Sequence, residues 1–214
     1  GQGHLMKIKE IPEAELTCVC DIDPKVAKKV SEEYKVPGFS DYKELLDSNL
    51  VDAVLVATPH YFHPSVGIAA MEKGFHCLSE KPIAVSIKEA DKFVESAHKN
   101  KRVFAVMYQM RTLPEVRVAR KIVESGKLGE IRRTCLIQSN YRPQAYYDSA
   151  TWRATWKGEG GGVVINQAPH GMDLFLLLGG RPSKIMAKVR THLHKIEVED
   201  EAMALLEYPN GAWG

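Results

Sequence analysis

The chain has 214 residues, of which 44% are hydrophobic and 26% charged, and this composition excludes wholesale disorder, a collagen-like fibre and a coiled coil. Its 29 basic and 27 acidic residues leave a net charge of +2 with no strongly basic segment, so we expect no nucleic-acid partner. No apolar stretch approaches the ~20 residues of a membrane span, and no secretory signal is visible, so we expect no membrane partner.

Four cysteines are too few and too scattered to predict a disulfide scaffold. Cys18 and Cys20 lie in the apolar run 16–20, where we expect both to be reduced and packed in the core. Their C-x-C spacing has no nearby His or Cys pair to complete four ligands, so we predict no metal site. The same cysteine usage predicts a reducing, cytoplasmic compartment.

The first 110 residues alternate between apolar runs and segments with helical spacing. We predict the strands and helices in chain order as strand 16–20, helix 24–35, strand 51–57, helix 64–73, strand 75–79, helix 86–100 and strand 103–107. The run 51–57 has no polar alternation, which predicts a fully buried strand. Short β-α-β connections predict a doubly wound parallel sheet with helices on both faces. We therefore predict a Rossmann-type dinucleotide-binding domain over residues 1–110, with its first strand missing from this chain.

The pattern changes after residue 110. We predict a helix from about 115, a strand at 131–140, an apolar helix at 167–178, and strands at 183–192 and 198–208. Long strands with few helices predict an α+β domain with a large, mostly antiparallel open sheet over residues 111–214. The turn signal at 209–211 ends the last strand, so we expect its partner strand to lie beyond the chain.

Three features of the first half suggest a dinucleotide site. Gly1-x-Gly3 fits the end of a phosphate-binding turn, or a flexible start of the chain. Asp21 follows an apolar strand about 20 residues later, where an acid would bind the adenosine ribose and repel a 2′-phosphate, or would simply cap a turn. Thr58 and Pro59 follow another strand, and residues at the carboxyl ends of parallel strands line the ligand crevice.

Glu80-Lys81-Pro82 follows the predicted strand 75–79 and is the most informative motif of the first half. A lysine ammonium placed by burial or a neighbouring charge can share its proton with a substrate oxygen, whereas an isolated E-K-P could equally be a solvated loop.

The second half carries three glycines, 160–162, followed by Asn166 and His170. Glycines allow a close backbone approach, and Pro169 predicts that a helix begins with His170 in its first turn. A histidine there is suited to general acid–base chemistry. We expect Lys81 and His170 to meet in a crevice between the two domains. No nucleophile elbow and no P-loop is present, and His192 and His194 have no third ligand partner.

Together these motifs resemble the glucose–fructose oxidoreductase / inositol dehydrogenase / MocA family of NAD(P)-dependent oxidoreductases. The resemblance spans essentially the whole chain and rests on the G-x-x-H start, T-P-x-x-x-H at 58–63, E-K-P at 80–82 and G-G-G-x-x-x-N-x-x-x-H at 160–170. It implies hydride transfer between NAD, or less favourably NADP, and a carbinol carbon of a sugar, cyclitol or other polyol. It also implies a homodimer or homotetramer formed through the C-terminal sheet.

The resemblance also assigns site residues. Lys81 would be the catalytic lysine, His170 the general acid–base and Asn166, an Asp in many members, a substrate-orienting residue. The implied cofactor-binding residues are Gly1, His4, Asp21, Thr58, Pro59, His63, Glu80, Lys81 and Gln109. The implied substrate-binding residues are Lys81, Arg111, Tyr141, Trp152, Arg153, Asn166 and His170, although core packing is an equal expectation for the aromatic side chains.

Two other functions remain open. Some members of the family use tightly held NAD to cleave glycosides by oxidation and elimination, with no net NADH formed. A non-catalytic dinucleotide- or sugar-binding regulator would have the same fold, but the presence of both Lys81 and His170 argues against it.

Overall fold

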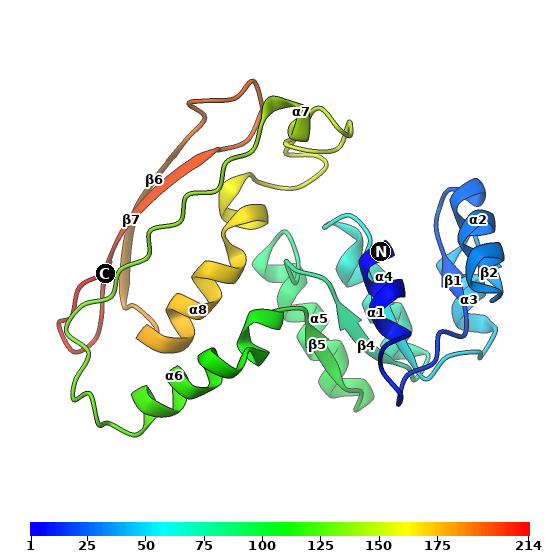
Figure 1. Cartoon of the computed structure of the whole chain (residues 1–214), viewed down its shortest axis with the longest axis horizontal. Coiled ribbons are helices and arrows are strands. Elements are labelled where there is room, and N and C mark those ends of the chain that lie inside the picture. Colours follow the sequence, from blue (N-terminus) through cyan, green and yellow to red (C-terminus); the bar gives the residue numbers. More distant parts are fainter. The chain divides into compact units, whose positions relative to one another are not determined.

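The computed structural model describes all residues 1–214 (Figure 1). The chain forms two compact units, Gly1–Val106 and Met107–Gly214, which are described separately below. No helix in either unit has the length and apolar character needed to cross a lipid bilayer.

The first unit is built from short parallel strands and helices. Its elements are α1 (Gln2–Ile8), β1 (Val19–Cys20), α2 (Pro24–Tyr34), β2 (Gly38–Phe39), α3 (Tyr42–Asp47), β3 (Ala53–Val56), α4 (Phe62–Glu72), β4 (His76–Ser79), α5 (Ile87–Asn100) and β5 (Phe104–Val106). All strand pairs are parallel, in a β1-β2 sheet and a β3-β4-β5 sheet. The predicted Rossmann-type parallel arrangement is thereby confirmed, whereas α1, β2 and α3 were not predicted.

The two sheets of this unit are not hydrogen-bonded to each other. In the usual doubly wound order the first strand lies at the centre, between the strands that correspond to β1 and β3. No strand of the described chain occupies that central position.

Helices α2, α3 and α5 of the first unit begin at residues that cap them. Asp23 accepts a hydrogen bond from the Lys25 amide, and Pro24 occupies the first turn of α2. Ser86 accepts one from the Glu89 amide, as in a capping box, at the start of α5. Local signals therefore determine the starts of these helices.

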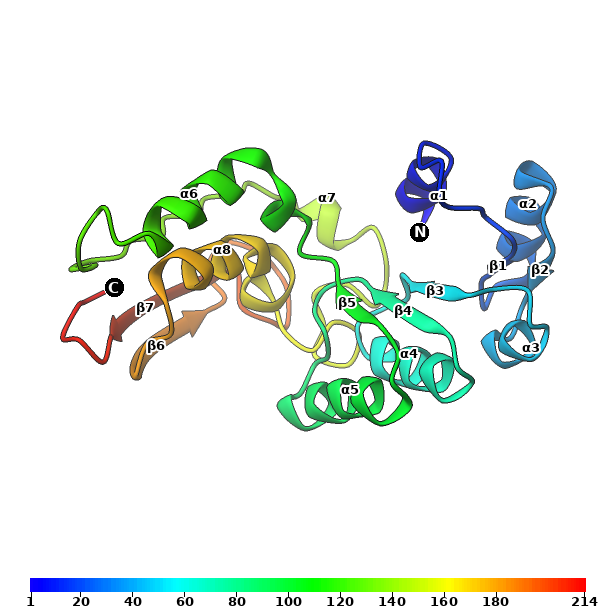
Figure 2. The same cartoon turned by 90° about the horizontal axis from the view of Figure 1, so that it is seen from below.

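The core of the first unit lies between α4, α5 and the three-stranded sheet. Figure 2 shows α4 and α5 side by side on one face of β3, β4 and β5. Phe93 and Met71 are fully buried there, with Val56 and Cys77 beside them. Burial raises the pKa of the Cys77 thiol to about 12, so this cysteine is an inert packing residue.

Two expectations about burial are wrong. The strand predicted at 51–57 is not fully buried, because β3 is the outer strand of its sheet and Ala53 is exposed. Cys18 is buried as expected, but Cys20 is exposed, since the strand ends at this residue.

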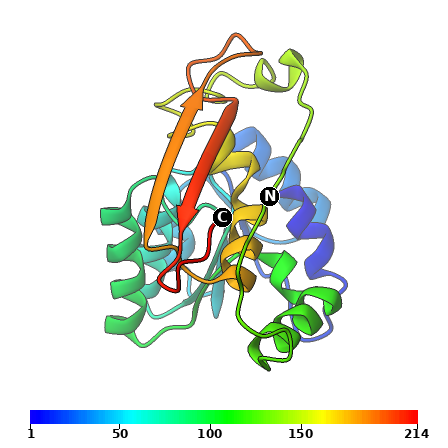
Figure 3. The same ribbon diagram turned by 90° about the vertical axis from the view of Figure 1, so that its left-hand side faces the viewer.

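The second unit contains η1 (Gln109–Thr112, a 3-10 helix), α6 (Pro114–Glu124), α7 (Gln144–Tyr147), η2 (Val163–Gln167, a π-helix), α8 (Pro169–Gly179), β6 (Lys184–Arg190) and β7 (Glu201–Glu207). Strands β6 and β7 form a long antiparallel pair, in which Ala187 lies opposite Ala204 (Figure 3). This confirms an antiparallel sheet in the C-terminal unit, although the sheet has two strands within this chain.

The strand predicted at 131–140 is absent. This segment makes a single bridge, between Arg133 and Trp213, and otherwise has no strand partner. Its apolar pattern suits a strand, but a strand exists only where a neighbour completes the hydrogen-bond ladder.

Gly67, in the middle of α4, sets how closely α5 packs. A Cβ at this position would lie 2.2 Å from Cζ of Phe93 and 3.0 Å from Sγ of Cys77. We expect Gly67→Ala to lower the free energy of unfolding by about 1–3 kcal/mol, because overpacking outweighs the ~1 kcal/mol gain in helix propensity. Urea unfolding would measure this change. Ser65→Ala, at an exposed position of the same helix, is the control, and a stabilised Gly67→Ala protein would contradict the close packing.

Candidate active site

The residues predicted from the first half lie beyond the carboxyl ends of three parallel strands. Asp21 directly follows β1, Thr58 and Pro59 lie just beyond β3, and Glu80 and Lys81 directly follow β4. The Glu80 amide donates to the Val56 carbonyl oxygen at 2.8 Å, which ties the end of β4 to the end of β3. We call these residues the carboxyl-edge group; ligands of open parallel sheets bind at this edge.

Asp21 occupies a turn, as one of its two sequence interpretations stated. Its Oδ1 accepts a hydrogen bond from the Asp23 amide at 3.0 Å, and the residue is exposed. The turn holds the carboxylate at the end of β1 without burying it. An exposed carboxylate in this position still fits a ribose diol.

Glu80 contacts two other residues that the sequence predicted for the cofactor site, His4 and Lys81. The peptide bond between Lys81 and Pro82 is cis. Oε1 of Glu80 lies 2.6 Å from Nε2 of His4 on α1, and its Oε2 accepts the Lys81 amide at 3.1 Å. Through these two contacts Glu80 fixes the backbone from which the Lys81 side chain extends, and it connects that backbone to α1.

His63 holds two loops of the carboxyl edge together. Its ring is 1% exposed, with Nδ1 2.7 Å from the carbonyl oxygen of Pro82 and Nε2 2.8 Å from that of Thr58. Direct contact of His63 with a cofactor, as expected from the sequence, does not fit this arrangement, because both ring nitrogens face main-chain oxygens in the interior. The histidine instead joins the loops that carry Thr58 and Lys81.

In the second unit, His170 lies in the first turn of α8, as Pro169 predicted. The Tyr108 ring meets its imidazole edge-on, with the ring centroids 5.9 Å apart. Burial, followed by the nearby charge of Asp173, raises the pKa of the Tyr108 hydroxyl, so this group stays protonated at neutral pH. Tyr108 was not predicted, and no local motif marked it.

Arg111 forms a bidentate pair with Asp173 of α8, with Nε 2.7 Å from Oδ2 and Nη2 bonded to Oδ1. This hydrogen bonding raises the pKa of Arg111 further above its ordinary value. Arg111 was expected to bind substrate, and Gln109 of the same short helix is exposed. The bidentate pair instead joins η1 to α8, close to Tyr108 and His170.

The glycine run allows a close approach of the protein to itself. A Cβ on Gly162 would lie 1.8 Å from the main-chain oxygen of Glu199. The Glu199 carboxylate is 8% exposed and accepts the amides of Gly162 at 2.9 Å and Val164 at 3.1 Å. The segment before β7 therefore holds the start of the π-helix, and no ligand is needed to explain the glycine at 162.

Asn166 lies in this π-helix rather than on a face of α8. Its amide nitrogen donates to the buried carboxylate of Glu159, and its main-chain N–H donates to the Gly162 carbonyl oxygen. π-Helical turns occur frequently at functional sites, because the inserted residue redirects a side chain. Glu159 was not predicted either.

The aromatic segment before the glycines is organised in part around an arginine. Tyr141 is 83% exposed and makes no ring contact. Arg153 lies over the Tyr146 and Trp152 rings at 4.6 and 4.8 Å and donates to the Tyr146 hydroxyl at 2.8 Å. These side chains pack on one another beside Gln167, which also donates to the Tyr146 hydroxyl, as the packing interpretation predicts. Substrate binding by Tyr141, Trp152 and Arg153 stays a prediction.

The two histidines at 192 and 194 serve the loop before β7. Nδ1 of His194 lies 2.9 Å from Asp200, and its Nε2 lies 2.8 Å from the carbonyl oxygen of Arg142. Burial alone would raise the pKa of Asp200, but hydrogen bonds from the His192 and Leu193 amides and from His194 lower it to about 2. This carboxylate therefore stays charged and organises the loop.

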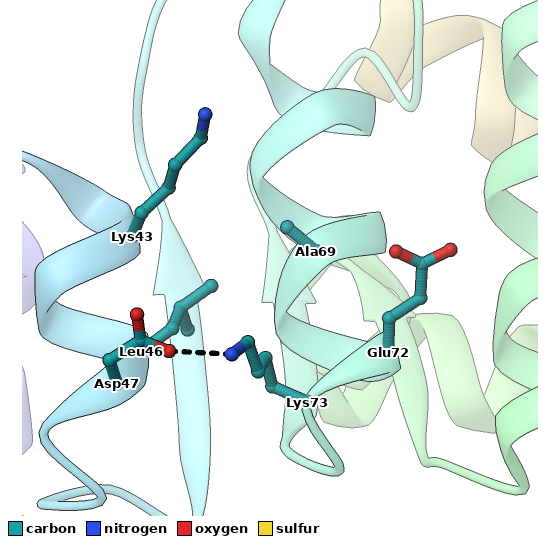
Figure 4. Close-up of a pocket in the computed structure, with 6 residues that line it drawn as sticks. All are labelled: Lys43, Leu46, Asp47, Ala69, Glu72 and Lys73. Carbon is teal, nitrogen blue, oxygen red and sulfur yellow. Dashed lines mark hydrogen bonds and ion pairs between the residues drawn. The ribbon is translucent and has the colours of Figure 1, made fainter.

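The first unit contains a hollow of about 310 Å³ (Figure 4). It is lined by residues of α3 and α4 and of the turn after α4, among them Asp47 and Lys73, whose ion pair spans 2.6 Å. Helix α4 ends there and leads into the amino end of β4, so this hollow is at the opposite edge of the sheet.

The parallel strands of the first unit, with polar residues beyond their carboxyl ends, define the class of Rossmann-type dinucleotide-binding folds. Residues 1–108 match the model described as "Oxidoreductase family, NAD-binding Rossmann fold", and residues 116–214 match the GFO/IDH/MocA C-terminal domain. The chain belongs to the GFO/IDH/MocA family, which confirms the resemblance found in the sequence.

Individual relatives are dehydrogenases and hydratases. Levoglucosan dehydrogenase of Pseudarthrobacter phenanthrenivorans is 26% identical over 92% of this chain and 56% of its own length. The 2,7-anhydro-N-acetylneuraminate hydratase of Escherichia coli is 29% identical over 92% of this chain and 53% of its own length. The chain therefore spans little more than half the length of these relatives.

Among solved structures, the WlbA dehydrogenase from Bordetella pertussis in complex with NADH and UDP-GlcNAcA is 30% identical. It superimposes with a TM-score of 0.90 over 100% of this chain and 66% of that one. The similarity between the two folds agrees with the predicted α/β architecture.

The two contacts of His63 lead to a stability prediction. We expect His63→Leu to lower the free energy of unfolding by about 1–3 kcal/mol, because the imidazole donates a hydrogen bond to at least one of the two buried carbonyl oxygens and leucine cannot. Urea unfolding would measure the loss, and hydrogen exchange should rise in the loops after β3 and β4. His98→Leu, at an exposed histidine of α5, is the control. A change below about 0.5 kcal/mol would show that the histidine does not join these loops.

Proposed function

We propose that the protein carrying this sequence is an NAD-dependent dehydrogenase that oxidises a carbinol of a sugar, cyclitol or related polyol, or reduces the corresponding carbonyl. The observation that carries this proposal is the position of Lys81, directly beyond the carboxyl end of β4 in an NAD-binding Rossmann fold. Relatives named as dehydrogenases and a similar structure in complex with NADH and a nucleotide sugar support the same reaction class.

The residues of the carboxyl edge fit a dinucleotide. Asp21 presents an exposed carboxylate at the end of β1, where it would accept hydrogen bonds from the adenosine ribose. A Cβ at Gly1 or Gly3 would meet no other atom within 4 Å, so the space beside the backbone is open to a phosphate there. The contact between Glu80 and His4 would hold both side chains beside the bound cofactor. Bound NAD supplies the hydride acceptor.

In the proposed reaction His170 accepts the hydroxyl proton of the carbinol, while the Lys81 ammonium stabilises the negative charge that develops on its oxygen. Lys81 belongs to the first unit and His170 to the second, so their meeting at one substrate stays a prediction. Tyr108 keeps the imidazole of His170 in place through its ring edge. Asn166 orients the substrate hydroxyl, and Trp152 and Arg153 offer a face and donors for a sugar ring.

Relatives named as hydratases of an anhydro sugar favour a second candidate. In it, the same residues would carry out oxidation, elimination and return of the hydride, so that NAD is regenerated within each turnover. The glycosidase alternative from the sequence belongs to this type of reaction. Substrate conversion with no net NADH would distinguish it from a dehydrogenase.

We further propose a cytoplasmic location and a homo-oligomer. The four cysteines form no disulfide, which supports a reducing compartment. Met186, Met203 and Leu205 are more than half exposed and lie on one face of the β6-β7 pair, which supports an association surface there.

A panel of sugars and cyclitols with NAD, followed by the absorbance of NADH, tests the proposed function. We expect Lys81→Ala to lower kcat by about 10² or more, because the developing alkoxide loses its positive charge. Lys88→Ala, at an exposed lysine of α5, should retain activity. Full kcat in the Lys81→Ala protein would show that this lysine has no catalytic role.

The cofactor preference rests on Asp21. We expect Asp21→Ser to raise the ratio of kcat/KM with NADP to that with NAD by about 10-fold or more, because ribose hydrogen bonds to the carboxylate and its repulsion of a 2′-phosphate are both lost. Steady-state kinetics with each cofactor would measure the ratio. Asp52→Ser is the exposed control, and an unchanged ratio would remove Asp21 from the ribose site.

A further inference from the structure

The carboxylate of Glu159 is buried in the second unit, where the residue is 2% exposed. It lies in the chain between α7 and η2. Its Oε2 accepts the Ala154 amide at 2.6 Å, and its Oε1 accepts the side-chain amide of Asn166. Burial of a carboxylate costs free energy unless hydrogen bonds satisfy both of its oxygens. Both contacts are therefore needed to stabilise the buried group.

The contact fixes which way the Asn166 amide faces. Nδ2 of Asn166 donates to Oε1 of Glu159, so the amide nitrogen is the side of the amide group that faces Glu159. The Oδ1 atom shares a planar carbon with Nδ2 and therefore points away from Glu159. Asn166 thus presents an acceptor, and not a donor, on its other side.

A hydrogen bond also holds the backbone of Asn166. Its N–H donates to the Gly162 carbonyl oxygen at 2.9 Å, and Gly162 is itself bonded to the buried Glu199 carboxylate. Two buried carboxylates therefore hold the π-helix that precedes His170, one through main-chain amides and one through the Asn166 side chain.

We propose that Glu159 is a positioning residue for the reaction, which fixes Asn166 so that its Oδ1 accepts a hydrogen bond from the substrate hydroxyl. The proposal rests on the proposed dehydrogenase function and extends it to a residue that has no place in the sequence motifs. It also explains how an uncharged Asn166 can act as a fixed acceptor: the carboxylate lies one hydrogen bond behind it. Without Glu159 the amide could turn over and present a donor.

A charge exchange between the two positions tests this role. In Glu159→Gln the new amide cannot accept from both Ala154 and Asn166, and in Asn166→Asp two carboxylates oppose each other. We expect kcat per folded molecule to fall on the order of 10-fold or more in each single variant.

The double variant, which combines Glu159→Gln with Asn166→Asp, should restore both contacts, with donor and acceptor exchanged only in the contact between positions 159 and 166. The new amide nitrogen at position 159 donates to the new carboxylate at position 166, while the new amide oxygen at position 159 accepts the Ala154 amide. We expect the kcat of the double variant to recover to within about 3-fold of the wild type.

Three measurements accompany kcat: the midpoint of thermal unfolding, the KM for the sugar, and the Kd for NADH from its fluorescence. A positioning role predicts a loss of kcat and a rise in KM for the sugar, with the Kd for NADH unchanged. Glu197→Gln is the matched control, because exposed Glu197 accepts the Trp156 amide in the same loop region without contacting Asn166. It should retain wild-type kinetics.

Wild-type kcat in Glu159→Gln would overturn the proposal, as would a double variant no better than the poorer single variant. A loss that disappears when kcat is normalised to the folded fraction would show a purely structural role and would also overturn it. The wild type is assayed first with the sugar panel. If it converts no sugar, the proposed function itself fails; if it is active and the variants match it, only the role of Glu159 fails.

Discussion

Buried polar side chains with hydrogen-bond partners hold the loops around Thr58 and Lys81 and the segment that precedes His170. In the first unit the imidazole of His63 is enclosed between the carbonyl oxygens of Thr58 and Pro82. In the second unit, the carboxylates of Glu159 and Glu199 take up amides from the segment around the glycines. Because an unsatisfied buried polar group costs more than a hydrogen bond gains, each of these side chains constrains the main chain around it.

Because of this constraint, the residues that position the loops differ from the residues that would react with substrate. Lys81 extends from a backbone held by Glu80 and His63, and His170 begins a helix whose preceding turn is held by Glu159 and Glu199. The side chains that would meet substrate are therefore carried by irregular segments with internal supports, at the ends of regular elements. Ligand sites in parallel α/β proteins have this construction because strand ends leave their loops at a common edge.

The family comparison and the geometry answer different questions. The comparison shows the family and its NAD-binding fold for residues 1–108. The geometry shows that Arg111 is bonded to Asp173 and that the Gly162 approach is to Glu199, so neither feature needs a ligand to explain it. Lys81, Asn166 and His170 stay the predicted catalytic residues, and the structure adds Tyr108 beside His170 and Glu159 beside Asn166.

The sequence by itself determined the order and type of most elements, the parallel first unit, the start of α8 at Pro169 and the edge positions of Asp21, Thr58 and Lys81. These follow from local causes: apolar periodicity, capping residues and the rule that residues after parallel strands share an edge. Only the tertiary structure decided that 131–140 is not a strand, that His63 faces two carbonyl oxygens and that Glu159 supports Asn166. Each of these depends on a partner distant from any local motif, and no periodicity or spacing in one sequence specifies which buried polar group will find which partner.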